Sequence, residues 1–364
     1  MISKIAVSKS ALAAVIAMLL PVLSSIIYIL PLPFGGAEIF PYYLLIVIAQ
    51  MTLMKFHFVR LISLSALFTL LFVCYSFLGV KADVYLDMLQ IYVVFITLIC
   101  FQSFSIEQRK IVSRTALSLL YVFAVIMIFQ KLNPSGIDFV YNWLVQRSGS
   151  SSHIMSYTGG VIGIGPEPAY MAALCLALGL IALSSAGMPA LRVVFFTGIC
   201  IVLTQSLSVF MIFIVNMILY LGFSRKQVLL ILSLILGFFF SAWFFNMSLI
   251  ERVYRFLFLI DFSTGFDFFL TIDRAFGSFR LRPVYDFLSF SDWDFSVMTV
   301  SQKGSSIFSE LFYKVGYLSY VLLIYFLFKS GHKRLKFTAV VNAIFLGPIL
   351  NWGLYVGLAG ERRE

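Results

Sequence analysis

Long apolar stretches alternate along this chain with short loops that carry most of its charge. A helix needs roughly twenty apolar residues to cross a hydrocarbon core of about 30 Å. We expect such helices at residues 11–33, 38–54, 58–80, 84–104, 112–132, 167–186, 190–205, 207–223, 227–247, 305–328 and 337–358. The pattern therefore predicts an all-α polytopic membrane protein with about 11 transmembrane helices, in which residues 1–364 form a single membrane domain.

Two polar segments interrupt this alternation, and we expect both to be long external loops. The first covers residues 133–166 and the second covers residues 248–304. Irregular backbone is excluded from lipid-exposed hydrocarbon, so segments of this length must be solvated or buried in protein. The aromatic and apolar content of the second loop predicts short helices in the membrane interface. We expect the functional residues to lie in these loops.

The net charge of +10 follows the predicted topology. If the predicted helices cross the membrane in alternating directions, Lys81 is the one basic residue in a short loop on the outer side. The basic residues that fall on the other side are Lys4, Lys9, Lys55, Arg60, Arg109, Lys110, Arg114, Arg192, Arg225, Lys226, Lys329, Lys333, Arg334 and Lys336. This asymmetry predicts a cytoplasmic N-terminus and places both long loops outside. Because the positive charge is explained by topology, it gives no reason to expect nucleic acid as a partner. The sequence does not decide on which side of the membrane the C-terminus lies.

The composition belongs to the membrane class. The chain is 61% hydrophobic and 12% charged, with a mean hydropathy of +1.01, whereas a soluble domain has roughly 25% charged residues. The four cysteines lie within apolar stretches and lack metal-ligand spacing, so we interpret them as small buried hydrophobic residues. We expect no metal and no cofactor.

Glu167 is the candidate catalytic residue. It stands between Pro166 and Pro168, where the sixth predicted helix begins. Proline suits the first turn of a helix, and the helix dipole favours a carboxylate there. The carboxylate would therefore either only stabilise the helix start, or orient or deprotonate a substrate hydroxyl at the outer mouth of the bundle. Ionisable residues at the membrane edge favour the functional interpretation.

Other residues near Glu167 are candidate contacts for a phosphate or glycan substrate. Arg147 offers either a solvated charge or a guanidinium fork for phosphate. His153 has no second histidine or cysteine near it, which argues against a metal site, and Tyr170 falls in the first turn of the sixth helix. The glycines of this loop do not follow a nucleotide-binding pattern.

The second loop carries a cluster of positive charge. Arg274, Arg280 and Arg282 lie within one short stretch and at helical spacing would bind a doubly charged diphosphate. Neighbouring aspartates offer the alternative of simple neutralisation. These aspartates are Asp273, Asp286, Asp292 and Asp294. Glu310, at the start of the tenth helix, either caps that helix or lines the site.

At these residues the chain resembles the Wzy-type O-antigen and capsular repeat-unit polymerases, which are relatives of the O-antigen ligases. The resemblance covers nearly the whole length and depends on the order of several short motifs. These motifs are Pro166-Glu167-Pro168-Ala169-Tyr170, Thr204-Gln205-Ser206, Asp273-Arg274, and the residues from Ser305 to Leu311 ahead of Gly316.

The resemblance implies a metal-independent membrane glycosyltransferase with a GT-C-like bundle in the bacterial plasma (inner) membrane. It would polymerise undecaprenyl-diphosphate-linked oligosaccharide units on the outer face, for lipopolysaccharide or capsule. Glu167 would be the base or the acceptor-orienting group. The four arginines of the two loops would bind the departing diphosphate in place of a metal ion. Membrane lipids and a chain-length regulator protein are further partners in this interpretation.

Two other functions stay open. An O-antigen ligase is less favoured because no histidine lies between Ile250 and Gly304, where that family's functional histidine would be expected. A lipid-linked oligosaccharide flippase or other transporter favours polar sites near the membrane midplane, whereas Asp87 is the clearest mid-span charge here. Which loop holds the donor and which holds the acceptor is also left open by the sequence.

Overall fold

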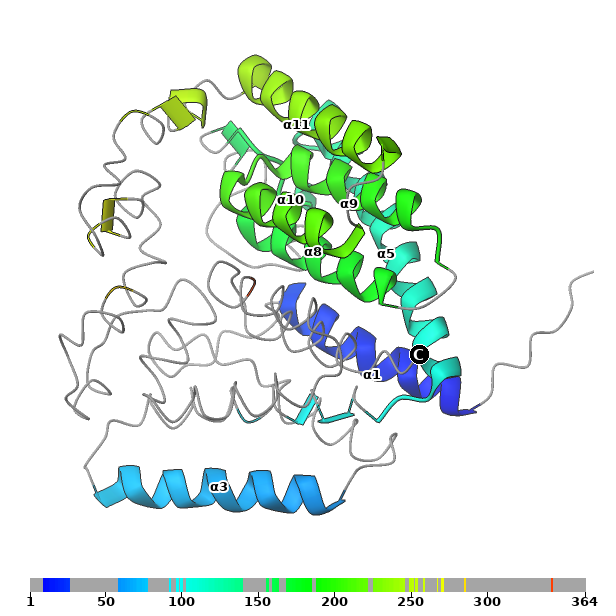
Figure 1. Cartoon of the computed structure of the whole chain (residues 1–364), viewed down its shortest axis with the longest axis vertical. Helices are drawn as coiled ribbons and strands as arrows, with labels where there is room; N and C mark the ends of the chain where they lie inside the picture. Colours follow the sequence, from blue (N-terminus) through cyan, green and yellow to red (C-terminus); the bar gives the residue numbers. More distant parts are fainter. Residues whose placement is uncertain are drawn as a thin grey trace, which may run out of the picture.

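The computed structural model is mostly helical in the part of the chain that it describes. The described residues are 9–26, 58–77, 92, 96, 97, 99, 100, 103–139, 155, 156, 159–163, 168–184, 188–221, 225–245, 249–251, 253, 254, 258, 267, 270, 271, 285 and 342. No strand occurs among them. The prediction of an all-α fold is confirmed for these residues (Figure 1).

Seven helices are described in full, and each overlaps a predicted apolar stretch. They are α1 (Lys9–Ile26), α3 (Phe58–Phe77), α5 (Ile106–Leu132), α8 (Pro168–Leu183), α9 (Ala190–Thr204), α10 (Leu207–Leu221) and α11 (Arg225–Phe245). The helix predicted at 84–104 is described at only a few positions. Those predicted at 38–54, 305–328 and 337–358 lie outside the described residues apart from Asn342.

The beginning of α5 shows what the hydropathy pattern missed. The Ser105 hydroxyl accepts a hydrogen bond from the Gln108 backbone N–H at 3.3 Å, and the Gln108 side-chain oxygen accepts one from the Ser105 N–H at 2.8 Å. This capping box satisfies backbone donors that would otherwise lack partners. Glu107 in the first turn and Lys131 in the last suit the helix dipole. The helix therefore begins at Ile106, ahead of the apolar stretch that starts at residue 112.

The core of the bundle is α8. Every residue from Met171 to Leu183 is buried, as expected for a helix that is apolar on all sides. It packs against α5, α9 and α10. At Gly179 an added Cβ would lie 2.9 Å from the Thr197 Cγ2 atom on α9, so this glycine permits the close approach of the two helices.

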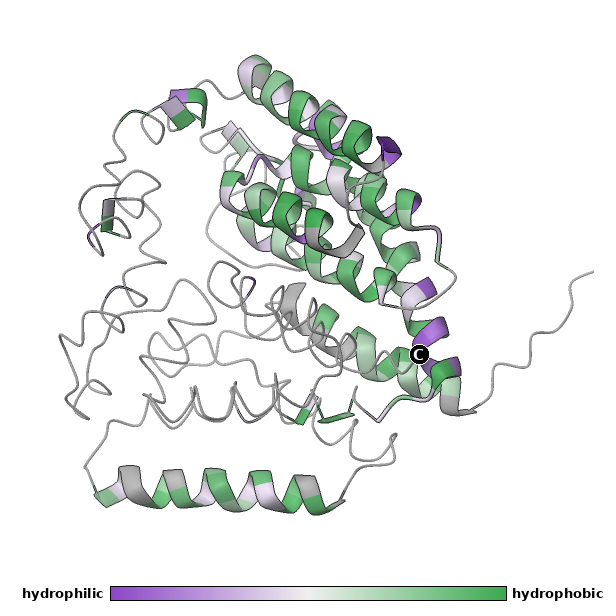
Figure 2. Ribbon diagram, viewed as in Figure 1, coloured by the Kyte–Doolittle hydropathy of each residue, from purple (hydrophilic) through white to green (hydrophobic). Residues whose placement is uncertain are grey.

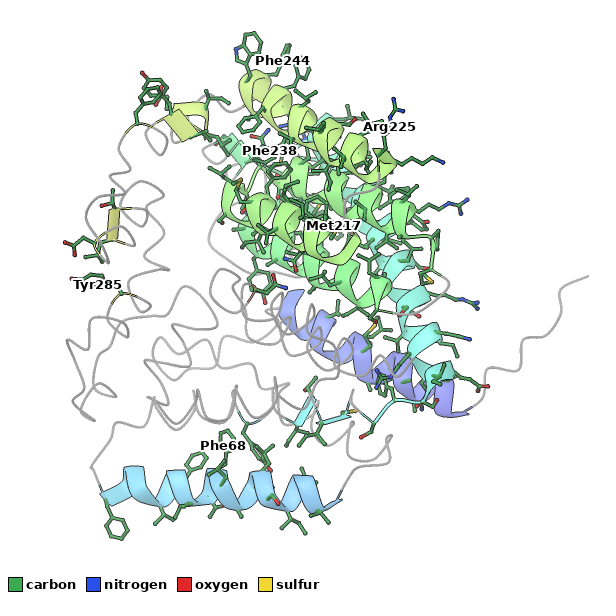
Figure 3. All side chains as sticks on the ribbon, in the orientation of Figure 1. Phe68, Met217, Arg225, Phe238, Phe244 and Tyr285 are labelled. Atoms are coloured by element: carbon green, nitrogen blue, oxygen red, sulfur yellow. The ribbon has the colours of Figure 1, made fainter. Side chains whose placement is uncertain are left out.

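Helix α10 packs against both α8 and α9, and α11 packs mainly against α9. Phe210 and Phe238 stack face to face, with ring centroids 4.0 Å apart and an interplanar angle of 8°. Phe238 points from α11 into the bundle in Figure 3. Helix α1 packs against α5, whereas α3 lies apart in Figure 1. The Ser65 and Tyr92 hydroxyls are hydrogen-bonded at 2.7 Å, which links α3 to the residues before α5.

Helices α5 and α11 are among those that turn large apolar side chains away from the bundle. On α5 these are Val122, Val125, Phe129 and Leu132, each at least 50% exposed. On α11 they are Leu229, Leu232, Leu236, Phe240 and Trp243. Both sets recur at helical spacing, so each forms a continuous apolar face, and apolar residues cover most of the ribbon in Figure 2. Within the described ranges, α5 alone combines the length and hydropathy of a membrane-crossing helix, while the other strongly apolar helices are shorter.

The described positions of the second predicted loop are helical as well. Residues 249–251, 253, 254, 258, 267, 270, 271 and 285 all have helical conformation. The Thr271 hydroxyl donates to the Asp267 carbonyl, four residues earlier, at 3.2 Å. The ring centroids of Tyr254 and Phe258 are 4.3 Å apart. These positions agree with the short helices predicted for this segment.

Candidate functional site

Of the predicted site residues, Tyr170 is the one that lies in the described part of the chain. It is half-buried in the first turn of α8, and α8 begins at Pro168, within one residue of the predicted start. The other predicted site residues lie outside the described residues, so their roles stay predictions. They are Glu167, Arg147, His153, Arg274, Arg280, Arg282 and Glu310.

The first predicted loop returns to the bundle through Gly159–Gly163, which we call the loop return. The Val161 N–H donates to the Leu203 carbonyl of α9 at 2.9 Å. The Gly163 N–H donates to the Gln130 side-chain oxygen of α5 at 2.8 Å, and Lys131 Nζ donates to the Gly159 carbonyl at 3.3 Å. Val161 and Ile162 are fully buried. The loop return is therefore attached to the C-terminal ends of two helices.

Glycine is needed in the loop return for two reasons. Gly159 and Gly163 have φ angles of 68° and 57°, which favour glycine because a side chain is strained there. At Gly160 the reason is space, since an added Cβ would lie 2.8 Å from the Thr204 carbonyl carbon and closer still to its oxygen. The same Cβ would be 3.3 Å from Pro168 Cβ. Gly160 thus lies where the end of α9 and the start of α8 meet.

The turn between α9 and α10 is the tight hairpin predicted from its polar sequence. Only Gln205 and Ser206 separate the two helices. Gln205 has φ 53° and ψ 29°, a left-handed conformation that costs a residue with a Cβ about 1–2 kcal/mol. Its Nε2 atom donates to the Ser241 carbonyl at 3.2 Å and to the Ser241 hydroxyl at 3.0 Å. The hairpin is therefore tied to α11.

Polar side chains are buried at this end of the bundle. Gln130 is fully buried, and Thr204 and Gln205 are 1% and 5% exposed. Gln130 Nε2 and Gln205 Oε1 are buried and have no hydrogen-bond partner among the described residues, and leaving such a group unpaired typically costs about 1–3 kcal/mol. Gln130 contacts the loop return at Gly163, and Gln205 follows Thr204, whose carbonyl lies against Gly160. We call this region, formed by the ends of α5, α9 and α11 and the starts of α8 and α10, the loop-return end.

No protein-family model, curated protein or solved structure matches this chain. The loop-return end is therefore interpreted from its own chemistry. It brings together the ammonium group of Lys131 and the buried side-chain amides of Gln130 and Gln205. It also includes Pro168, which follows Glu167 in the chain and begins the helical turn that contains Tyr170. Among the described residues, no group of three or more His, Cys, Asp or Glu side chains is arranged to hold a metal ion.

Gln130 and Lys131 were missed by sequence reasoning. In the sequence they are a polar pair at the end of an apolar stretch. This pattern is equally typical of a helix end with no function. Their partners, Gly163 and Gly159, are 33 and 28 residues away along the chain. Gln205 was part of a predicted motif, but its contact with Ser241, 36 residues away, has no local signal.

Proposed function

We propose that this chain is a multi-span plasma-membrane protein that polymerises undecaprenyl-diphosphate-linked oligosaccharide repeat units by glycosyl transfer on the outer face. The observation that carries the proposal is the loop-return end, where Gly160 brings together the α9–α10 hairpin and Pro168. Glu167, the candidate base, is bonded directly to Pro168. The start of α8 thus lies against the loop return and the end of α9, and the positioning of a reacting carboxylate requires such support.

The ends of α11 support a membrane-spanning arrangement. Arg225 begins the helix and is exposed, whereas Trp243 and Phe244 are exposed near its other end, as Figure 3 shows for Arg225 and Phe244. The separation of Arg225 and Trp243 along a helix axis is about 27 Å, close to the thickness of a hydrocarbon core. Between them lies the apolar face of α11. A basic end and an aromatic end are typical of a helix that crosses a bilayer.

The direction of three helices supports an outer location for the loop-return end. Helices α5, α9 and α11 all carry basic residues in their N-terminal turns and all end at the loop-return end. Those basic residues are Arg109, Lys110, Arg114, Arg192, Arg225 and Lys226, and Figure 2 shows hydrophilic residues at these ends of α5 and α11. Basic residues favour the cytoplasmic side. We therefore assign the opposite end of these three helices, the loop-return end, to the outside, in keeping with the eleven-span topology.

In the proposed reaction, a sugar hydroxyl of the incoming unit attacks the anomeric carbon of the lipid-linked chain. The new glycosidic bond forms as the bond from that carbon to the diphosphate oxygen breaks. Glu167 takes the hydroxyl proton, and undecaprenyl diphosphate leaves as an anion held by Arg147 and by Arg274, Arg280 and Arg282. Guanidinium groups stabilise the developing charge without a metal ion.

The test compares surface polysaccharide, separated by length on a gel, from a deletion strain complemented with wild type or with Glu167→Gln. We expect wild type to restore a ladder of lengths and Glu167→Gln to leave a single-unit band at equal protein level. Glu107→Gln is the matched control, because Glu107 is an exposed carboxylate in the basic first turn of α5. Polymer that remains on the carrier lipid in the deletion strain would indicate a ligase instead. Units trapped on the cytoplasmic face would indicate a flippase.

A further inference from the structure

Gln205 connects the places where the two long loops join the bundle. The first connection runs through its neighbours in α9. The Leu203 carbonyl accepts the Val161 N–H at 2.9 Å, and the Thr204 carbonyl lies so close to Gly160 that no Cβ fits between them. The loop return cannot shift relative to the hairpin without breaking this contact. The start of α8 is tied in too, because Pro168 lies next to Gly160.

The second connection runs through the side chain of Gln205. Its Nε2 atom donates to both the carbonyl and the hydroxyl oxygen of Ser241. Ser241 is one turn before the end of α11 at Phe245, and the second predicted loop begins at residue 248. The amide group is buried, so water does not compete for these two hydrogen bonds. The end of α11 is therefore held at a fixed distance from the hairpin.

The backbone of Gln205 makes this clamp unusual. A residue in the left-handed conformation at the end of a helix is most often glycine, and Gln205 is the described non-glycine residue with a positive φ. Strained backbone persists where surrounding contacts over-determine it, and such positions cluster at functional sites. Here the contacts that oppose the strain are those of the Gln205 amide with α11.

We propose that Gln205 is a positioning residue for the transfer reaction, a role that rests on the proposed function. By clamping the hairpin to α11, it fixes the start of α8, which follows Glu167 in the chain, relative to the end of α11, which precedes the segment with the three arginines. Its side chain acts through Ser241 and does not touch the reacting atoms. Loss of the clamp leaves the binding groups intact but misaligns them, and a misplacement of about 1 Å lowers turnover by up to roughly 100-fold.

The experiment uses full-length protein in liposomes, with lipid-linked repeat units extracted from the deletion strain as substrate. The main variant is Gln205→Gly, which suits the left-handed backbone and removes only the side chain. We expect kcat to fall roughly 10- to 100-fold while KM changes less than threefold and the melting temperature is kept. Gln205→Glu should also lower kcat, because a carboxylate cannot donate to the Ser241 carbonyl, and its buried charge should in addition lower the melting temperature.

A double-mutant cycle separates positioning from general destabilisation. Ser241→Ala removes one of the two acceptors, and in the Gln205→Gly background it should cause no further loss, because coupled residues are not additive. Ser233→Ala is the control on α11, since the Ser233 hydroxyl is exposed and bonds within its own helix, to the Leu229 carbonyl at 2.8 Å. A Gln205→Gly protein with wild-type kcat, or with losses that simply add to those of Ser241→Ala, overturns the proposal. If wild type itself makes no polymer, the proposed function is wrong and this role is wrong with it.

Discussion

Replacing Gly160 by alanine tests the contact on which the loop-return end depends. The new Cβ would lie 2.8 Å from the Thr204 carbonyl carbon and 3.3 Å from Pro168 Cβ, whereas carbon atoms in contact are about 3.5–4.0 Å apart. The peptide group of Thr204 must therefore move by roughly 1 Å. Neither neighbour is a flexible side-chain end, so the strain cannot be relieved by a change of rotamer.

The expected loss of stability follows from two effects. Overpacking of this kind costs about 1–3 kcal/mol. The Val161–Leu203 hydrogen bond is one residue away on each side, and its loss adds about 1 kcal/mol. We therefore expect Gly160→Ala to lower the free energy of unfolding by about 2–4 kcal/mol. The assay is unfolding by a rising SDS fraction in mixed micelles, followed by the fluorescence of the four tryptophans.

Gly237→Ala is the matched control. Gly237 lies inside α11, is exposed, and has nothing within 4 Å of an added Cβ. Alanine is a better helix former than glycine, so this variant should gain about 0.5–1 kcal/mol. If Gly160→Ala were as stable as Gly237→Ala, the loop return would not contact the end of α9 as described. The argument that ties the start of α8 to the hairpin would then be refuted.

The contact between Asn216 and Asn342 makes a further prediction. The Asn216 amide donates to the Asn342 oxygen at 2.7 Å and accepts in return at 3.3 Å, so Asn216→Leu should cost about 1–3 kcal/mol in the same assay. Adding Asn342→Leu should recover part of this loss, and a single variant as stable as wild type would contradict the pairing.

Much of the helical layout follows from local sequence. The α9–α10 hairpin was predicted because Thr204 to Ser208 is polar between two apolar stretches, and the start of α8 was predicted from Pro168. The start of α5 was placed too late, because hydropathy alone gives no weight to the capping box formed by Ser105 and Gln108. Signals of this kind act over one or two turns, which is why a single sequence carries them.

The contacts of the candidate site are of a different kind. Gln130 with Gly163, Gln205 with Ser241 and Asn216 with Asn342 join residues far apart in the chain. Each is a polar residue in or beside an apolar stretch, and the stretch itself gives no indication of its partner. The roles of Glu167 and of the arginines remain predictions from the sequence.

The enclosure of α8 has a consequence for how the chain is made. Its partner α5 precedes it in the sequence, whereas α9 and α10 follow it. During synthesis from the N-terminus, α8 therefore emerges before two of the three helices that cover it. Its apolar surface stays uncovered by those helices until residue 221, the end of α10, has been added. A chain interrupted before that point would present this surface to chaperones or proteases, so the centre of the bundle is covered only after helices that follow it in the sequence have been made.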